Sequence, residues 1–452
     1  MNEEKYTRNL ELSDLFFAGF GFIIGAGIFT LMPLIIKYGK GYSWISFILG
    51  GFICLLTGLS YAKLNQEYPS NDAEYSWIYN ILNFNKPDEN GKKKKPNVFV
   101  RGLANSIIWI VMIIGLFNTA TVAVGVSNFI TQYVNISKTL MVGLSIAVPS
   151  LINILGNKYS TVFNKGIMSL IIGTFATLIV LGGVKGKNFS ENSLVPKTTD
   201  LSGILRSSFI TIFAYNGFQS IVQLSEEARD ISDIPKGIYA SIGASTGLYA
   251  AIAVAVISLL GINTASSSIN PIAHSFEKNP IAASFDKIIK NSKLDYYFVN
   301  ILSSVALLNT LMLIILSRSR LLQKLSVRGL APKMFSKLSN VGKLLGIEKF
   351  KTQGKNNEPV TIPILAIVAV ALASFGVSFI KEGAIESLAT LTNSFIFIVF
   401  IIVHALVLIN HHKTSNKNKS GDKIKSLRDY PFYALGGLGL SALYLVKSFS
   451  YN

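Results

Sequence analysis

The stretch Phe22-Ile23-Ile24-Gly25-Ala26-Gly27-Ile28-Phe29 decides the fold, because it places two glycines inside an apolar run that is long enough to cross a membrane. Backbone groups freed by a helix break find no partners in hydrocarbon, so such a break persists only where it faces protein, water or a ligand. A second apolar run is interrupted at Phe213-Ala214-Tyr215-Asn216-Gly217-Phe218. Two matched breaks are typical of a transport site near the middle of the membrane.

The composition places the chain among polytopic membrane proteins. Half of the 452 residues are hydrophobic and 15% are charged, and runs of roughly 17 to 25 apolar residues with few charges predict membrane spans. Eleven such runs are found: Leu15–Ile36, Trp44–Leu64, Ile107–Ile130, Leu140–Leu155, Gly166–Val184, Ile204–Leu224, Ile238–Ile262, Tyr296–Leu316, Ile362–Ile380, Ile385–Ile409 and Phe432–Val446. We therefore expect an all-α membrane protein with one transport domain over residues 1–452.

The formal net charge of +18 does not require a nucleic-acid partner. The dense basic clusters are Lys86 with Lys92–Lys95, Arg318–Lys355 and Lys413–Arg428, and alternating the eleven spans assigns all of them to one side of the membrane. An excess of Lys and Arg marks cytoplasmic loops, so the amino terminus is predicted to be cytoplasmic. Anionic lipid headgroups are then the expected contact, in the plasma membrane or an endomembrane.

The two breaks fall in the first and sixth predicted spans. This spacing predicts a five-plus-five repeat, with residues 15–184 as the first half, 204–409 as the second, and 432–446 as a peripheral eleventh helix. Because each half holds an odd number of spans, the second half is inverted in the membrane. The two broken helices would then run antiparallel, and their gaps would meet near the midplane.

The first break offers groups that recognise the backbone of an α-amino acid. Gly25-Ala26-Gly27 frees amides at the positive end of a half-helix, which can receive a carboxylate without a cationic side chain. Carbonyls that end the preceding half-helix, around Ile23 and Ile24, can accept from an ammonium group. A packing surface of small residues, shared with Gly19 and Gly21, explains the glycines equally well.

The second break, Tyr215-Asn216-Gly217, carries polar groups deep in an apolar run. Asn216 and Gln219 are costly in hydrocarbon unless they line a cavity or pair with protein. Phe213 and Phe218 add aromatic surface that can close over a substrate. The alternative is a buried structural hydrogen bond between the polar residues.

These residues resemble the amino acid-polyamine-organocation (APC) permeases. Four elements in family order carry the resemblance: Gly25–Phe29 in helix 1; Tyr61–Leu64, Tyr68-Pro69 and Glu74-Tyr75 around the end of helix 2; Phe213–Phe218 with Glu226-Glu227 and Asp233-Ile234-Pro235 in helix 6 and its loop; and Ser317-Arg318 to Arg328–Pro332 after helix 8. The phenylalanine-alanine-tyrosine form of helix 6 is most similar to that of eukaryotic-type neutral and cationic amino acid permeases.

The resemblance implies a leucine-transporter-like five-plus-five inverted repeat and assigns site residues. Gly25, Ala26 and Gly27 would hold the substrate carboxylate, the carbonyls of Ile24 and Phe213 would hold its amine, and the Phe213 ring would act as a gate. The predicted substrate-binding set is Ile24, Gly25, Ala26, Gly27, Phe213, Ala214, Tyr215, Asn216, Gly217, Phe218 and Gln219.

The chain departs from the family pattern at several positions. Lys63 replaces a common acidic residue of helix 2, and Asn71-Asp72-Ala73 replaces paired glycines. Ile171 stands where many members carry a helix-5 lysine, so proton coupling through that lysine is not expected. Eleven spans are predicted where twelve are usual.

Three further groups have two interpretations each. Glu226 and Glu227 form either a gating latch or a solvated helix end. Ser303 and Ser304, with Asn309, offer hydroxyl and amide groups for a sodium ion or for ordinary hydrogen bonds between helices. His404 is more typical of a hydrogen-bonded bundle residue than of a proton relay.

The sequence therefore predicts transport of amino acids by alternating access, as a secondary transporter or exchanger. Neutral L-amino acids are favoured, because the spans expected to line the cavity hold no acidic residue away from their ends. The coupling ion, sodium or proton, is left open. No cofactor, metal or enzymatic activity is expected, since the sequence lacks clustered metal ligands, a nucleophile elbow and a phosphate loop. The alternative is a sensor or partner-binding protein that keeps the permease fold without transporting.

Overall fold

The structure is a computed structural model of the 452-residue chain. It describes residues 10–82, 97–131, 133–155, 157–186, 201–225, 228–260, 279–288, 293–340, 361–380, 385–418 and 430–451.

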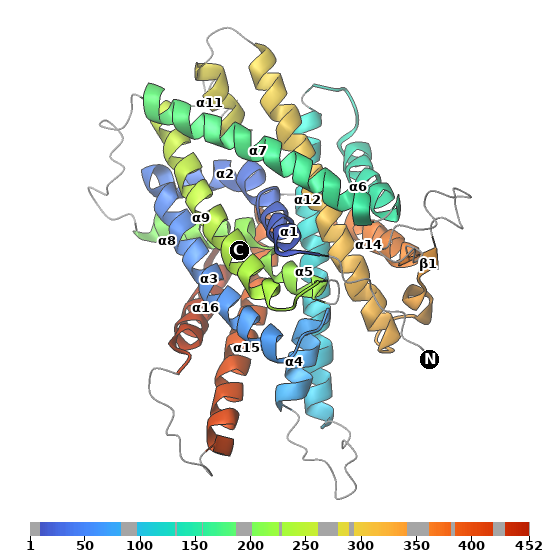
Figure 1. Ribbon diagram of the computed structural model, residues 1–452. Helices are drawn as coiled ribbons and strands as arrows, with labels where there is room; N and C mark the ends of the chain where they lie inside the picture. The colour runs from blue at the N-terminus through green and yellow to red at the C-terminus, as the bar shows by residue number, and fades with distance from the viewer. Residues whose placement is uncertain are drawn as a thin grey trace, which may run out of the picture.

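The described chain is almost entirely helical (Figure 1). The helices are α1 Leu12–Ile23, α2 Ala26–Gly39, η1 Lys40–Tyr42, α3 Ser43–Glu67, α4 Ala73–Leu82, α5 Val98–Ile130, α6 Lys138–Leu155, α7 Asn157–Lys185, α8 Leu201–Tyr215, η2 Phe218–Leu224, α9 Asp233–Leu260, α11 Pro280–Ile288, α12 Lys293–Val327, η4 Lys333–Ser336, α14 Ile364–Val377, α15 Ile385–Asn418 and α16 Phe432–Tyr451. The two-residue strands β1 Ser339–Asn340 and β2 Thr361–Ile362 pair antiparallel, with Ser339 opposite Ile362.

Each of the eleven predicted spans coincides with one or two helices of the described chain, and the predicted all-α polytopic fold is confirmed. Eight helical stretches of the described chain are long and apolar enough to cross a membrane, with residues 27–67 counted as one stretch, and α1 and α14 are shorter apolar helices. The first predicted span divides into α1 and α2, and the sixth divides into α8 and η2. Whether 15–184 and 204–409 are inverted copies of one another stays a prediction.

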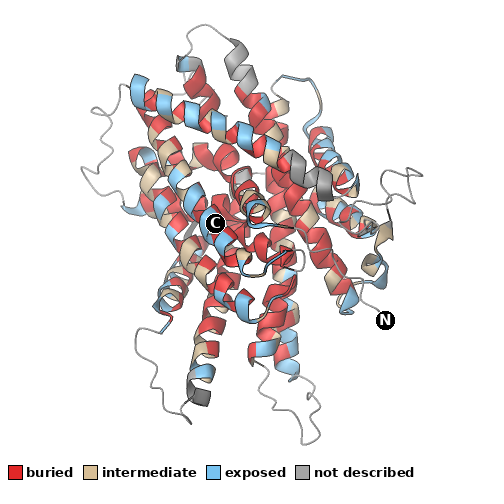
Figure 2. Ribbon diagram, viewed as in Figure 1, coloured by how far each residue is buried: buried red, intermediate tan, exposed pale blue. Residues whose placement is uncertain are grey.

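Burial follows the expected pattern of a bundle in lipid. Buried residues concentrate on the helix faces that meet inside the bundle, whereas exposed ones run along the outer side of helices such as α7 (Figure 2). Several of the exposed residues of α7 are nevertheless large and apolar, among them Leu170, Val180 and Val184. An apolar outer surface is compatible with lipid hydrocarbon, which offers no hydrogen-bond partners to polar groups.

The broken helices lie inside the bundle. Figure 1 shows α1 near its centre, and α1 and α2 pack against α9 and α8 respectively. The helices α5, α12 and α15 complete the surroundings of the breaks. The fold therefore brings together the two interruptions that the sequence marks as unusual.

Candidate functional site

The first break consists of Ile24 and Gly25, between α1 and α2. The Ile24 N–H donates to the Phe20 carbonyl at 2.8 Å, which is the last bond of α1. Two carbonyls near this end accept from distant side chains. The Thr310 hydroxyl of α12 donates to Gly21 O at 3.2 Å, and the Tyr249 hydroxyl of α9 donates to Ile23 O at 2.7 Å. Neighbouring helices thus satisfy groups that the break would otherwise leave in hydrocarbon.

The amide end of α2 has no side-chain cap. Gly25 is its N-cap residue and forms no capping hydrogen bond, and the first amides of any helix lack partners within the helix. These amides, together with the positive end of the helix dipole, suit a carboxylate. The assignment of Gly25-Ala26-Gly27 to a substrate carboxylate stays a prediction.

The glycines of the first break also permit close packing. A Cβ atom on Gly25 would overlap the Thr310 hydroxyl, and one on Gly27 would overlap the Cα of Ala214 in α8. A Cβ on Gly19 would fall 2.8 Å from the Ser241 hydroxyl. The packing interpretation thus accounts for the glycines whether or not a ligand is bound.

The second break lies directly against the first. Gly217 follows Tyr215 and Asn216 with φ +136°, in the left-handed region that favours glycine. A Cβ there would fall 2.7 Å from the Cβ of Phe22 in α1. Together with the contact between Gly27 and Ala214, this places the amide end of α2 beside the carbonyl end of α8.

The polar residues of the second break bond to one another. Gln219 accepts from the Gly217 N–H at 3.1 Å and donates through its amide to Asn216 Oδ1. This is the buried pair that the sequence left as an alternative. The Asn216 amide nitrogen is buried and has no hydrogen-bond partner among the described residues, so one donor remains for a ligand or a water.

The aromatic residues of the second break point in different directions. The Tyr215 hydroxyl donates to the Phe47 carbonyl of α3 at 2.8 Å. The Phe218 ring packs against Tyr61 and Phe400, with centroids 5.8 and 6.0 Å away. Phe213 and Ala214 are fully buried beside the first break. Only part of the predicted binding set therefore lies where the two breaks meet.

Sequence reasoning did not single out Tyr249 and Thr310. The Tyr249 hydroxyl lies 2.7 Å from Ile23 O and 3.4 Å from Ala214 O, so it bridges the carbonyl ends of both breaks. Thr310 joins α12 to the first break. A single hydroxyl in an apolar span is common, and only the packing of α9 and α12 reveals what these two contact.

The predicted ion-binding serines have other partners. Ser303 accepts from Asn279, which precedes α11, at 3.1 Å, and Ser304 donates to the Asn300 carbonyl. Ile171 of α7 is buried and apolar. Asn164 links α7 to α1 and α12, because its amide donates to Phe17 O at 3.1 Å and its oxygen accepts from Asn309 at 2.8 Å. Glu226 and Glu227 lie outside the described residues, so the predicted latch stays a prediction.

His404 of α15 is a hydrogen-bonded bundle residue. Its ring nitrogens lie 3.2 Å from the Thr57 hydroxyl and 2.9 Å from the Ser60 hydroxyl, both in α3. Gly437 of α16 packs so closely that a Cβ there would overlap the ring. These contacts explain the residue without a proton relay.

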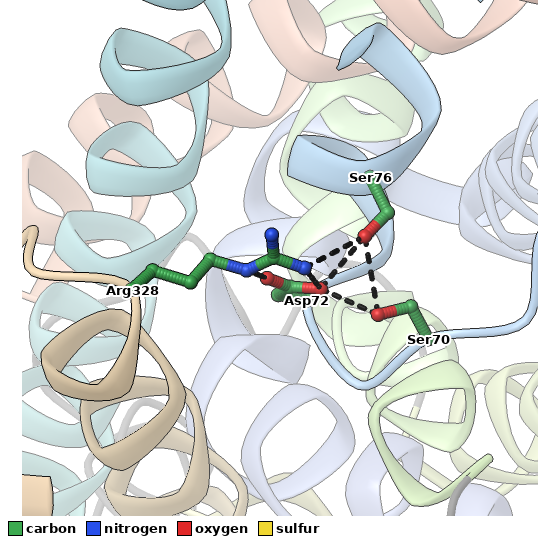
Figure 3. A network of polar contacts seen from close by, with 4 residues as sticks. All are labelled: Ser70, Asp72, Ser76 and Arg328. Atoms are coloured by element: carbon green, nitrogen blue, oxygen red, sulfur yellow. Dashed lines mark hydrogen bonds and ion pairs between the residues drawn. The ribbon is translucent and has the colours of Figure 1, made fainter. Parts of the chain in front are cut away.

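A polar clamp, made of Ser70, Asp72, Ser76 and Arg328, joins α4 to the end of α12 (Figure 3). Asp72 is fully buried, and its carboxylate pairs with Nε of Arg328 and accepts from Nη2 at 2.9 Å. Ser70 and Ser76 donate to the same carboxylate. Gly329, at φ +75°, ends α12 and fixes where Arg328 leaves the helix. The departure at Asp72 from the paired-glycine pattern is thus matched by a specific partner.

Comparison with known proteins agrees with this architecture. The family model described as amino acid permease matches residues 10–450. The chain is 24% identical to the vacuolar cationic amino acid transporter 2 of Arabidopsis thaliana, over 89% of this chain and 60% of the relative. It is 25% identical to the branched-chain amino acid permease BcaP of Bacillus subtilis, over 55% and 54%, and 27% identical to the methylthioribose transporter of that bacterium, over 56% of each chain. The matches thus span little more than half the length of these relatives. Because the family match covers nearly the whole sequence, the chain belongs to the amino acid permease family.

Proposed function

We propose that the protein transports amino acids across a membrane by alternating access, and that its substrates are neutral L-amino acids. The observation that carries the proposal is the contact between the two helix breaks, Gly217 against Phe22 and Gly27 against Ala214. One half-helix ends there in carbonyls and another begins in uncapped amides. This pair of groups is complementary to the ammonium and carboxylate of an amino acid backbone.

The charge around the breaks supports neutral substrates. In the described part of α1, α2, α5, α8, α12 and α15, acidic residues occur only at helix ends, namely Asp14, Asp295 and Glu386. A carboxylate does reach this region from α4, where Glu74 lines a cavity, but Arg318 lines the same cavity. With the Arg318 guanidinium beside it, Glu74 gives the region no net negative charge, whether its carboxyl is ionised or protonated.

The relatives do not determine which side chain the substrate amino acid carries. Their names refer to cationic amino acids, branched-chain amino acids and methylthioribose. Substrate class therefore varies among proteins that share this fold, and it must come from the residues of each chain. The cytoplasmic amino terminus and the choice of membrane also remain our inferences from the charge pattern.

Counterflow into proteoliposomes tests the proposal. Vesicles are preloaded with unlabelled alanine, serine or leucine, and entry of the same radiolabelled amino acid is followed. We expect counterflow well above that of empty liposomes. Excess unlabelled neutral amino acids should suppress it, and equal concentrations of arginine, lysine or putrescine should not. Stronger suppression by the cations would overturn the neutral assignment, whereas no counterflow with any amino acid would favour the non-transporting alternative.

A further inference from the structure

A small cavity lies beside η2 and is lined by two buried charged residues. Its volume is about 10 Å³, close to the smallest cavity that can hold one water molecule. Its polar lining consists of Tyr61, Glu74, Gln219 and Arg318, and its apolar lining of Val111, Ile114, Ile396, Val399 and Phe400. Glu74 comes from α4, a ten-residue helix outside the stretches long enough to cross a membrane.

The carboxylate of Glu74 is only half satisfied. Tyr61 of α3 donates to its Oε1 at 2.9 Å, whereas Oε2 is buried and has no hydrogen-bond partner among the described residues. Arg318 of α12 has unused donors to match this unused acceptor, because its Nε and Nη1 are buried without hydrogen-bond partners among the described residues. Its remaining nitrogen meets the Ser220 hydroxyl only at 3.5 Å. A buried charge without a close partner is costly, so this arrangement calls for an explanation.

The surroundings of Glu74 disfavour its ionised form. Burial raises the pKa of this carboxyl, and the nearby Asp72 charge raises it further, against the lowering effects of the backbone amide, the Tyr61 hydroxyl and the Arg318 charge. Asp72 is itself paired with Arg328. The cavity residues from α5 and α15 are all apolar and contribute no titratable group. A neutral acid on Glu74 removes the unpartnered anionic oxygen from this site.

Glu74 is connected to the helix breaks through two aromatic rings. The Tyr61 ring that holds Glu74 packs edge-on against Phe218, with centroids 5.8 Å apart. Phe218 begins η2 directly after Gly217, the residue that abuts Phe22 of α1. Packed side chains thus connect Glu74 to the point where the two broken helices meet.

We propose that Glu74 is the proton-carrying group that couples transport to a proton gradient. It takes up a proton on Oε2 from hydronium that reaches the cavity from the outer side, carries that proton while the cavity is closed, and returns it to cytoplasmic water when α4 separates from α12. The inference rests on the proposed transport function. A proton fits where a hydrated metal ion does not, since the cavity has room for one water and also holds a guanidinium group.

The direction of coupling follows from linkage. The buried carboxyl has a raised pKa, and a hydrated one returns toward its ordinary value, so the closed state binds the proton more tightly. Acidic conditions therefore favour the closed state, and opening toward the cytoplasm releases the proton. Coupling operates at pH values between the hydrated and the buried pKa. Below both values the group stays protonated in each state, and coupling is lost.

Uptake driven by a pH gradient, compared with counterflow, tests the proposal. At one proton per substrate, a gradient of one pH unit, acidic outside, sustains about tenfold accumulation. We expect wild-type proteoliposomes to approach this value. Glu74→Gln should retain counterflow of a neutral amino acid and accumulate it no more than at equal pH. Glu386→Gln is the matched control, because Glu386 is a half-exposed carboxylate paired with Arg206, and it should accumulate substrate like the wild type.

Two outcomes separate this inference from the proposed function. If the wild type shows counterflow and Glu74→Gln accumulates substrate in a pH gradient as the wild type does, the proton role is refuted. The proposal of amino acid transport would then still hold. Absence of counterflow in every protein would refute both. Infrared spectra of purified protein give a check that does not depend on transport. A carbonyl band of a protonated carboxyl should titrate in the wild type and in Glu386→Gln, and should be lost in Glu74→Gln. Retention of the band in Glu74→Gln would also refute the proposal.

Discussion

Gly27→Val is expected to abolish transport while the chain still inserts into the membrane. A Cβ atom at this position would overlap the backbone Cα of Ala214, and backbone cannot rotate away as a flexible side chain can. The valine must therefore force α2 away from α8, which separates the amide and carbonyl ends proposed to hold the substrate. Overpacking of this kind costs about 1–3 kcal/mol or more. Counterflow should fall to the level of empty liposomes.

Gly173→Val is the matched control for this variant. Gly173 lies on α7, and a Cβ there meets no atom within 4 Å. The same change in size and shape should therefore leave counterflow close to that of the wild type. Normal counterflow in Gly27→Val would show that the contact between α2 and α8 is not needed for transport.

Arg328→Ala is expected to cause a large loss of stability. The substitution removes the counter-charge of Asp72, which is fully buried, accepts a hydrogen bond from Arg328 on Oδ1 and forms an ion pair with it through Oδ2. Breaking a buried pair by removing one partner costs about 3–5 kcal/mol, because the remaining charge is left unpaired. The thermal unfolding midpoint of the purified protein should fall markedly. Arg328→Lys should lie in between, since lysine keeps the charge but not the two-point geometry.

Arg229→Ala provides the comparison for the clamp. Arg229 pairs with Glu11, and both side chains are 60% exposed, a setting in which ion pairs contribute little. Its unfolding midpoint should stay near that of the wild type. The double variant Asp72→Asn/Arg328→Ala should be less destabilised than the sum of the two single variants. Equal midpoints for Arg328→Ala and Arg229→Ala would reduce the clamp to a surface contact.

Much of the fold could be predicted from the sequence, because membrane helices are specified by long apolar runs. Both breaks could also be predicted. Gly25 and Gly217 lie inside long apolar runs, where glycine would destabilise an uninterrupted helix. The side chains that hydrogen-bond to the free carbonyls at the breaks could not be predicted. Tyr249 and Thr310 lie far along the chain from the carbonyls they contact, and no local pattern distinguishes them from other hydroxyl groups in apolar spans.

The carboxylate at the cavity beside η2 could not be predicted from the sequence either. A search for acidic residues within the lining spans overlooks Glu74, because this residue belongs to the short helix α4 after the second span. Only the packing of α4 against α5 and α15 brings its carboxylate to the cavity beside η2. Packing also accounts for Asp72. This residue departs from the family pattern, and Arg328 is its ion-pair partner.

The most direct test of the central claim is displacement of a bound neutral amino acid by analogues that lack one end of its backbone. If the two breaks hold the ammonium and the carboxylate, leucine should compete with a radiolabelled neutral substrate of the purified protein. Its deaminated analogue, 4-methylpentanoate, and its decarboxylated analogue, isoamylamine, should each compete at least about a hundredfold more weakly, because buried groups would lose their partners. Competition by either analogue as strong as that of leucine would contradict the assignment of the breaks as the amino acid site.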